Sequence, residues 1–263
     1  MNVQRYVSNE LTHFVGGNCN RDQQRQFGLL EKILYEGILK PPPTGGFADG
    51  FTLGVVHGGK LAGNRGLISS VVCFCDIPIA DISIHTRKYS LFGIAFTKSF
   101  MLAKGASPVF YVARDASAPY ATISEDETPN LEDAWEKVYR NQFKTTKKLE
   151  AYLKRQMPGK RRGSLILSSD RPGTTSPGGL LYDLDEISHA LNNLVYSNLK
   201  FFNGLDTDLS KDNFYMEREW RVRGELKFKL KDVTRIILPR RFARRLRERF
   251  PSFCGQVEFS NKN

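Results

Sequence analysis

The spacing of hydrophobic and polar residues predicts helices and strands in an irregular order. Apolar residues recur every three or four positions in three stretches that predict helices with one buried face: residues 21 to 36, 131 to 157 and 184 to 202. Apolar or alternating runs predict strands in four places: residues 69 to 79, 92 to 97, 108 to 113 and 213 to 230. Because these elements follow no regular strand–helix–strand rhythm, their order favours an α+β fold.

Turn and cap residues mark where the elements end and how the chain is organised. Asn18 or Asn20 can cap the first helix, and Gly37 ends it. Residues 115 to 185 combine acidic turns, a helix rich in lysine and arginine, and loops rich in glycine and proline. We expect this stretch to be a basic helical insertion in a single domain that spans residues 1 to 263.

The stretch from 213 to 230 alternates like a strand, yet one of its faces is strongly charged. That face would carry Tyr215, Glu217, Glu219, Arg221 and Arg223. Since side chains two residues apart on a strand lie about 7 Å from each other on one face, the two glutamates would be neighbours. Two adjacent carboxylates can stabilise a developing cation and orient a nucleophile. The alternative is an exposed strand face with weak Glu–Arg ion pairs.

Positive charge is concentrated in two segments of a chain whose net charge is +11. Residues 137 to 163 hold ten lysines and arginines against one acid, and residues 233 to 250 hold seven arginines against one acid. This favours a polyanionic partner, most simply nucleic acid, with solvated helix faces as the alternative. The candidate phosphate contacts are Arg240, Arg241, Arg244, Arg247, Lys160, Arg161 and Arg162. Three aromatic residues among these charges could stack on unpaired bases or anchor a helix: Tyr139, Phe143 and Tyr152.

Composition argues against membranes and metals. No apolar run approaches the roughly 20 residues that cross a bilayer, and the N-terminus lacks the apolar core of a signal peptide. We therefore expect a cytoplasmic protein without a membrane partner. Cys73 and Cys75 are spaced as C-x-C inside an apolar run, and the other cysteines and the histidines are scattered, so we expect no metal.

The Glu-x-Glu on a predicted strand resembles the catalytic element of NAD-dependent ADP-ribosyltransferases. In that fold an early strand supplies a His or Arg, a middle segment a Tyr or Ser, and a late strand the Glu. The chain offers His13, Tyr89 and Glu219 in this order. The resemblance implies an ADP-ribosyltransferase-like core with a mixed or antiparallel split β-sheet and flanking helices. It also implies that Tyr89 stacks on nicotinamide and that Arg87 meets the NAD pyrophosphate.

The same resemblance implies roles for the remaining candidates. Glu219 would bind the nicotinamide-ribose hydroxyl and stabilise the cationic transition state, while Glu217 would orient the acceptor. His13, with Thr12 beside it, would contact the adenosine ribose. From the residues alone, His13 can equally be a structural histidine and Arg87 an ordinary surface residue, and composition favours Tyr89 as an ordinary core aromatic.

A more specific resemblance covers roughly half of the chain. The segments that carry it are "YVSNELTHFVG", "LLEKILYEGIL", "VVCFCDIPIADISIHTRKYSLFGIAFTKSF", "GASPVFYVA" and "FYMEREWRV". Together they resemble the AbiGi-type abortive phage-resistance family. The chain is also similar to DarT-like nucleic-acid ADP-ribosyltransferases and to the toxin of toxin–antitoxin–chaperone phage-defence modules.

These resemblances imply a phage-defence toxin that cleaves NAD and transfers one ADP-ribose to nucleic acid. We favour RNA over DNA as the acceptor, as mRNA or single-stranded bases, because a base nitrogen must be unstacked to react. A cognate antitoxin, with or without a chaperone, would be a partner. One alternative is a non-catalytic antitoxin or nucleic-acid-binding component of an abortive-infection system. Another is an ADP-ribosyltransferase that modifies proteins.

Overall fold

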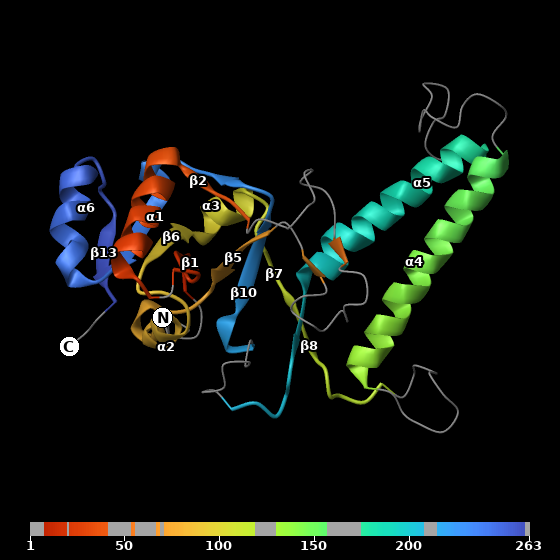
Figure 1. The fold of residues 1–263 in the computed structure, drawn as a ribbon, viewed down its shortest axis with the longest axis horizontal. Helices are drawn as coiled ribbons and strands as arrows, with labels where there is room; N and C mark the ends of the chain where they lie inside the picture. The colour runs from red at the N-terminus through yellow and green to blue at the C-terminus, as the bar shows by residue number, and fades with distance from the viewer. Residues whose placement is uncertain are drawn as a thin grey trace, which may run out of the picture. The chain divides into compact units, whose positions relative to one another are not determined.

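The computed structural model describes residues 8–19, 21–41, 54–55, 67–68, 71–118, 130–156, 175–207 and 215–260. The chain divides into two compact units, and Figure 1 labels the helices and many of the strands. The first unit contains Met1–Thr52, Ser70–Phe110 and Leu205–Asn263, and the second contains Leu53–Ser69 and Tyr111–Gly204. The segment predicted as an insertion, residues 115 to 185, falls within the second unit. A single domain over the whole chain stays a prediction.

The first unit is built on a seven-stranded mixed sheet. The strand order is β13 (Gln256–Phe259), β12 (Val233–Leu238), β6 (Gly93–Thr97), β1 (Glu10–Phe14), β5 (Val71–Cys75), β10 (Glu219–Arg223) and β7 (Ser107–Pro108). The β12–β13 pair is parallel, and the other neighbouring strands are antiparallel. The predicted α+β class with a mixed sheet is therefore confirmed.

Two fully paired ladders meet at a narrow junction in the middle of this sheet. Strand β1 pairs with β6 over five residues, and β10 pairs with β5 over five. Between β1 and β5, the register among the described residues consists of one pair, Thr12 with Cys75. Just beyond that pair, the Nδ1 atom of His13 lies 2.8 Å from the carbonyl oxygen of Cys73. The His13 side chain therefore binds the Cys73 carbonyl, which would accept from a backbone N–H group of β1 if the pairing of β1 with β5 continued.

Helices pack against both faces of the sheet in the first unit. They are α1 (Gln23–Glu36), α2 (Ser83–Lys88), α3 (Lys98–Ala103) and α6 (Ala243–Arg249). Short 3₁₀ turns lie at Ile79–Asp81, Tyr215–Glu217, Leu230–Asp232 and Arg240–Phe242, and β2 (Ile38–Leu39) pairs with β11 (Leu226–Lys227). Phe27 of α1 stacks on Phe242 with ring centroids 4.8 Å apart, so α1 and the segment before α6 share one core. On the other face of β1, the Phe14 ring stacks on His85 and Tyr89.

The ends of α1 are set by its caps. The side chain of Asp22 accepts hydrogen bonds from the backbone N–H groups of Gln24 and Arg25, so Asp22 is the N-cap. The prediction of Asn18 or Asn20 in that role is therefore wrong. Gly37 ends the helix in the left-handed conformation, with φ 65°, as predicted.

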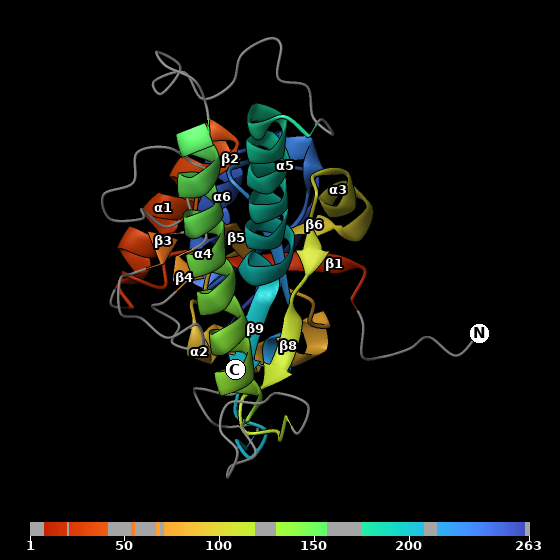
Figure 2. The ribbon, with the colours of Figure 1, turned by 90° about the vertical axis from the view of Figure 1, so that its right-hand side faces the viewer.

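In its described residues, the second unit contains two α-helices that lie side by side and two short sheets (Figure 2). The helices are α4 (Leu131–Gln156) and α5 (Pro177–Ala190), and the paired strands are β3 (Gly54–Val55) with β4 (Leu67–Ile68) and β8 (Phe110–Ala113) with β9 (Leu199–Phe202). Tyr139 and Tyr196 meet edge to face at 4.9 Å in a small core. The predicted helix over residues 131 to 157 is confirmed.

The predicted helix over residues 184 to 202 is partly wrong. Helix α5 begins earlier, because Ser176 caps it and Pro177 occupies its first position. It ends at Ala190 and is followed by a π-helical turn (Leu191–Val195), a 3₁₀ turn (Tyr196–Asn198) and β9. The apolar spacing of the predicted helix would bury Leu184, Ile187, Leu191, Leu194 and Leu199, but Ile187 and Leu194 are 58% and 65% exposed. Pairing of β9 with β8 overrides the helical periodicity of this segment.

Candidate active site at the start of strand β10

Strand β10 begins at Glu219, later than its sequence pattern predicts. Tyr215–Glu217 form a 3₁₀ turn, and Arg218 between the two glutamates has φ 46°. Residues with a Cβ rarely adopt this left-handed conformation, and such strain often lies at functional sites. Because the turn breaks the alternation, Tyr215 and Glu217 do not belong to the strand that carries Glu219. The prediction of one continuous strand face is wrong at this point.

Both glutamates are buried and each binds a cation. Glu217 is 5% exposed and Glu219 is 3% exposed. The Nε atom of Arg221 donates to Glu219 at 2.7 Å, and the Nζ atom of Lys88 donates to Glu217 at 2.9 Å. The Tyr89 hydroxyl donates to the same oxygen of Glu217. The alternative of an exposed strand face with weak ion pairs is wrong for these two carboxylates.

The sheet register places Glu219 at the junction of the two ladders. Glu219 lies opposite Cys75, and Cys75 lies opposite Thr12, so the three side chains form a row on one face. Neighbouring strands lie about 4.8 Å apart, so the backbones of Thr12 and Glu219 are separated by about 10 Å. Asp76, which follows Cys75, is a third buried carboxylate and accepts from the Nζ atom of Lys98 at 2.7 Å.

Tyr89 and His85 pack with Phe14 in a cluster of rings beside the glutamates. The rings of Phe14 and Tyr89 stack at 5.9 Å, and those of Phe14 and His85 at 6.1 Å. Burial raises the pKa of Tyr89, and the charge and hydrogen bond of Glu217 raise it further. The phenol therefore stays protonated and donates to the carboxylate.

His85 is a buried histidine whose role sequence reasoning missed. It is 4% exposed, and its Nδ1 atom has no hydrogen-bond partner in the described part of the chain. Burial lowers the pKa of His85 to about 4, and the nearby charge of Lys88 lowers it in the same direction. The ring is therefore neutral at neutral pH. The signal that could have found it is the spacing of four residues between His85 in α2 and Tyr89, which is the C-cap of that helix.

The predicted NAD contacts fall into two groups. Thr12 and Tyr89 lie with the glutamates, because Thr12 shares the row of Glu219 and Tyr89 binds Glu217. The half-buried side chain of His13 alternates to the other face of β1, where its ring lies 5.6 Å from that of Phe74. Burial lowers the pKa of His13, and its hydrogen bond with the Cys73 carbonyl opposes that shift.

Arg87 lies exposed on α2, and its Nε atom donates to the carbonyl of Ser83 at 3.3 Å. The structure thus brings Tyr89 and the two glutamates together. It gives His13 and Arg87 contacts with other parts of the first unit.

The predicted phosphate contacts near the C-terminus lie on the exposed side of the segment from Arg240 to Arg249. Arg240, Arg241, Arg244 and Arg247 are all exposed. Arg241 donates to Gln23 at 2.6 Å, and Arg244 donates to Glu248 at 2.8 Å. The remaining predicted contacts, Lys160, Arg161 and Arg162, lie outside the described residues. Nucleic-acid binding at these positions stays a prediction.

A neighbouring arginine has a structural role. Arg245 donates to Glu31 of α1 at 2.8 Å, and its guanidinium lies 4.7 Å from the centre of the Phe27 ring. This side chain therefore holds α6 against α1.

The side chains at the start of β10 include chemical groups that can bind sugar hydroxyls or phosphates. Glu219 can accept from a sugar hydroxyl, the Arg221 guanidinium is a preferred partner of phosphate, and the Phe14 and Tyr89 rings offer flat apolar surface. In the described ranges, no three His, Cys, Asp or Glu residues are arranged to hold a metal ion. No helix among these residues is long and apolar enough to span a bilayer.

Comparison with known proteins gives one result. A family model described as "Putative abortive phage resistance protein AbiGi, antitoxin" matches residues 66–247, which is more than half of the chain. The matched range contains α2, β5 and β10 with Tyr89, Glu217 and Glu219, while Thr12 and His13 precede it. No curated protein and no solved structure shows significant similarity to the chain.

Proposed function

The chain belongs to the AbiGi family of abortive phage resistance proteins, and on this premise we propose that it is an NAD-dependent mono-ADP-ribosyltransferase that modifies nucleic acid. One observation carries the proposal. Tyr89 comes from a part of the chain distant from Glu217 and Glu219, and the fold brings the three side chains into one cluster with both carboxylates buried. The cluster lies beside the narrow junction of the two ladders, a feature expected of a split sheet.

The two glutamates have complementary roles in this proposal. Glu219 accepts a hydrogen bond from the nicotinamide-ribose hydroxyl, and its charge stabilises the cation that develops at the sugar carbon as the bond to nicotinamide breaks. The acceptor then forms a bond to that carbon, and Glu217 takes up the proton that the acceptor loses. Tyr89, kept protonated by its surroundings, donates to Glu217 and orients it.

Arg221 connects substrate binding to the release of Glu219. In the structure this guanidinium is bound to Glu219, and the two side chains are 12% and 4% exposed. A dinucleotide brings two phosphates, which compete for the guanidinium as strong bidentate partners. Movement of Arg221 from the carboxylate to a phosphate would free Glu219 for the ribose.

The test uses NAD labelled in its adenosine part, purified protein and total RNA. The wild-type protein should attach label that nuclease removes and protease leaves. Glu219→Gln should lose the transfer and stay folded, with the circular dichroism spectrum of the wild-type protein, although its free energy of unfolding should be lower because Arg221 loses a buried partner. Glu225→Gln is the matched control, because Glu225 is exposed and lies just after β10. Label that resists nuclease and disappears with protease would instead support the enzyme that modifies proteins.

The family description favours a second candidate, a non-catalytic antitoxin. The ion pairs of Glu217 and Glu219 are consistent with it, because paired carboxylates can serve packing alone. The two candidates differ in growth assays. A toxin expressed alone should arrest growth, and Glu219→Gln should relieve the arrest. An antitoxin should be harmless alone and should protect cells from a cognate toxin. A toxin would in turn have its own antitoxin partner, with or without a chaperone.

A further inference from the structure

Helix α4 presents all of its basic residues on one face. They are Lys137, Arg140, Lys144, Lys147, Lys148, Lys154 and Arg155, and each is exposed. At 3.6 residues per turn, they fall within an arc of about 120° and extend about 27 Å along the helix. The opposite side of α4 contains its buried residues, Ala134, Tyr139 and Leu153. We call the exposed arc the basic face of α4.

The helix does not need this arrangement for its own stability. Arg140, Lys144 and Lys148 follow one another at intervals of four residues, and like charges at this spacing destabilise a helix. Two acids offset the charge in part: Glu136 pairs with Arg140, and Glu150 contacts Lys147 at 3.5 Å and Lys154 at 3.8 Å. Cations in the last turn complement the helix dipole, but those in the middle of α4 have no such reason. A polyanionic partner would give these middle cations a role.

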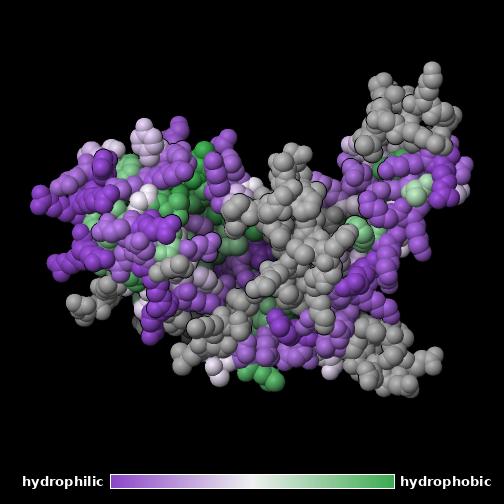
Figure 3. Space-filling model, viewed as in Figure 1, coloured by the Kyte–Doolittle hydropathy of each residue, from purple (hydrophilic) through white to green (hydrophobic). Residues whose placement is uncertain are grey.

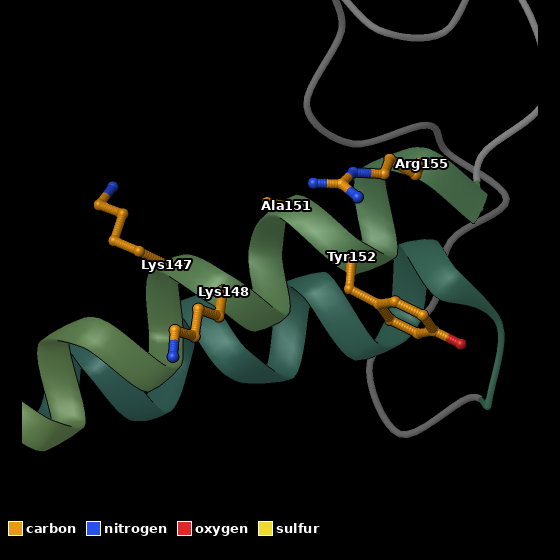
Figure 4. A pocket seen from close by; sticks show the side chains of 5 residues that line it. All are labelled: Lys147, Lys148, Ala151, Tyr152 and Arg155. Carbon is orange, nitrogen blue, oxygen red and sulfur yellow. The ribbon is translucent and has the colours of Figure 1, made fainter.

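A solvent-facing hollow lies near the C-terminal end of the basic face. Its volume is about 420 Å³, and it is lined by Lys147, Lys148, Ala151, Tyr152 and Arg155 (Figure 4). The small Ala151 side chain leaves space between the larger ones, and Tyr152 is 57% exposed. In the view of Figure 3, the surface over α4 and α5 is largely hydrophilic with small apolar spots. An exposed aromatic ring among cations is the arrangement on which proteins stack unpaired bases.

The structure separates the three aromatic residues suggested for stacking. Tyr139 is 8% exposed and packs on Tyr196, so it anchors the helix. Phe143 is 50% exposed, and the Nζ atom of Lys147 lies 5.9 Å from its ring centre. Tyr152 lines the hollow itself. It is therefore the residue best suited to receive a base.

We propose that the basic face of α4 binds single-stranded nucleic acid, with phosphates along its cations and one base stacked on Tyr152. The binding proposal deepens the proposed function. It rests on that function only where it takes the bound strand to be the nucleic acid that accepts ADP-ribose. A duplex offers no free base for the ring, because its bases already stack on each other. An acidic protein would use the cations alone and would leave Tyr152 without a role.

The experiment measures binding without NAD. Fluorescein-labelled oligouridine and oligodeoxythymidine are titrated with the full chain, and anisotropy is followed at several salt concentrations. If Lys147, Lys148 and Arg155 each neutralise a phosphate, they contribute about −2 to the slope of log K against log salt. Tyr152→Ala should weaken binding about tenfold. Leu149→Ala, at an exposed apolar position of the same helix, should change the affinity less than about twofold.

A second pair of variants distinguishes the effect of charge on the basic face of α4 from the effect of the protein's net charge. Lys147→Gln/Lys148→Gln/Arg155→Gln should remove most of the binding and make the salt slope shallower. The control removes three exposed lysines of the first unit: Lys32→Gln/Lys104→Gln/Lys227→Gln. It carries the same net charge and should bind nearly as tightly as the wild-type protein.

Three results would overturn the proposal: no binding at low salt, equal affinity of Tyr152→Ala and the wild-type protein, or equal losses in the two triple variants. Competition by polyglutamate as effective as competition by oligonucleotide would identify an acidic-protein surface instead. Tighter binding of oligouridine than of oligodeoxythymidine would identify RNA as the source of the strand, and the reverse order would identify DNA. Glu219→Gln should bind like the wild-type protein, so the catalytic proposal can fail without this one.

Discussion

The ion pair between Lys88 and Glu217 gives the sharpest stability prediction. Lys88→Met keeps most of the side-chain volume and removes the charge 2.9 Å from the carboxylate. The two side chains are 19% and 6% exposed, so solvent screens the pair poorly. Removing one partner of a buried pair costs about 3–5 kcal/mol, because the other charge stays buried without compensation. Since Glu217 also accepts from Tyr89, we expect the lower end, about 3 kcal/mol.

The assay is equilibrium unfolding in urea, followed by tryptophan fluorescence. Trp220 lies in β10, next to Glu219, and reports on the first unit, whereas Trp135 lies in α4 of the second unit. All variants are therefore made in a Trp135→Phe background, in which the fluorescence comes from Trp220 alone. Lys32→Met is the matched control, because its i,i+4 partner Glu36 is a surface residue and such pairs contribute less than about 1 kcal/mol. The double variant Lys88→Met/Glu217→Gln should regain most of the lost stability, since no buried charge is left unpaired. If Lys88→Met costs no more than Lys32→Met, the reasoning about a buried, charge-balanced site is refuted.

Three further predictions concern the same unit. His85→Phe should make the free energy of unfolding less dependent on pH. In the folded wild-type protein the pKa of His85 is lowered to about 4 from an ordinary 6.5, so the unfolded state binds more protons between these two pH values. Wild-type stability should thus fall by up to about 3 kcal/mol as pH drops through that window, as measured by urea unfolding at each pH. Arg245→Ala should cost about 1–2 kcal/mol in urea unfolding because it loses a hydrogen bond to a carboxylate, and Arg247→Ala less than about 0.5 kcal/mol; equal costs would contradict the contact. Gly37→Ala should cost more than about 1 kcal/mol in thermal unfolding, because φ is 65° and a Cβ would lie 2.5 Å from the carbonyl oxygen of Phe228; an unchanged melting temperature would refute this.

Local signals explain what the sequence could predict of the fold. The sequence of helix α4 contains no glycine or proline and repeats apolar residues at helical spacing towards both ends, and Gly37 is a strong stop signal, so both were predictable. The start of β10 was not, because Arg218 adopts a left-handed conformation that no residue preference indicates. The end of α5 was not either, since pairing of β9 with β8 depends on residues far apart in the chain.

The candidate site shows the same division between local and distant information. The Glu-x-Glu spacing drew attention to Glu217 and Glu219, and the structure places both in one buried cluster. Their partners Lys88 and Tyr89 lie more than a hundred residues earlier, so only the folded sheet brings them together. Strand alternation places His13 on the opposite face of β1 from Thr12. Which of these faces carries Glu219 follows only from the pairing of β1 with β5, which the sequence alone does not give.

The most direct test of the central claim is the rate at which the purified protein releases nicotinamide from NAD in the presence of RNA. The account predicts release by the wild-type protein and a fall of about a hundredfold or more in Glu219→Gln, which loses the charge that stabilises the sugar cation. Glu225→Gln should release nicotinamide at the wild-type rate. No release by the wild-type protein, or equal rates for the wild-type protein and Glu219→Gln, would contradict the assignment of Glu219 as the catalytic carboxylate.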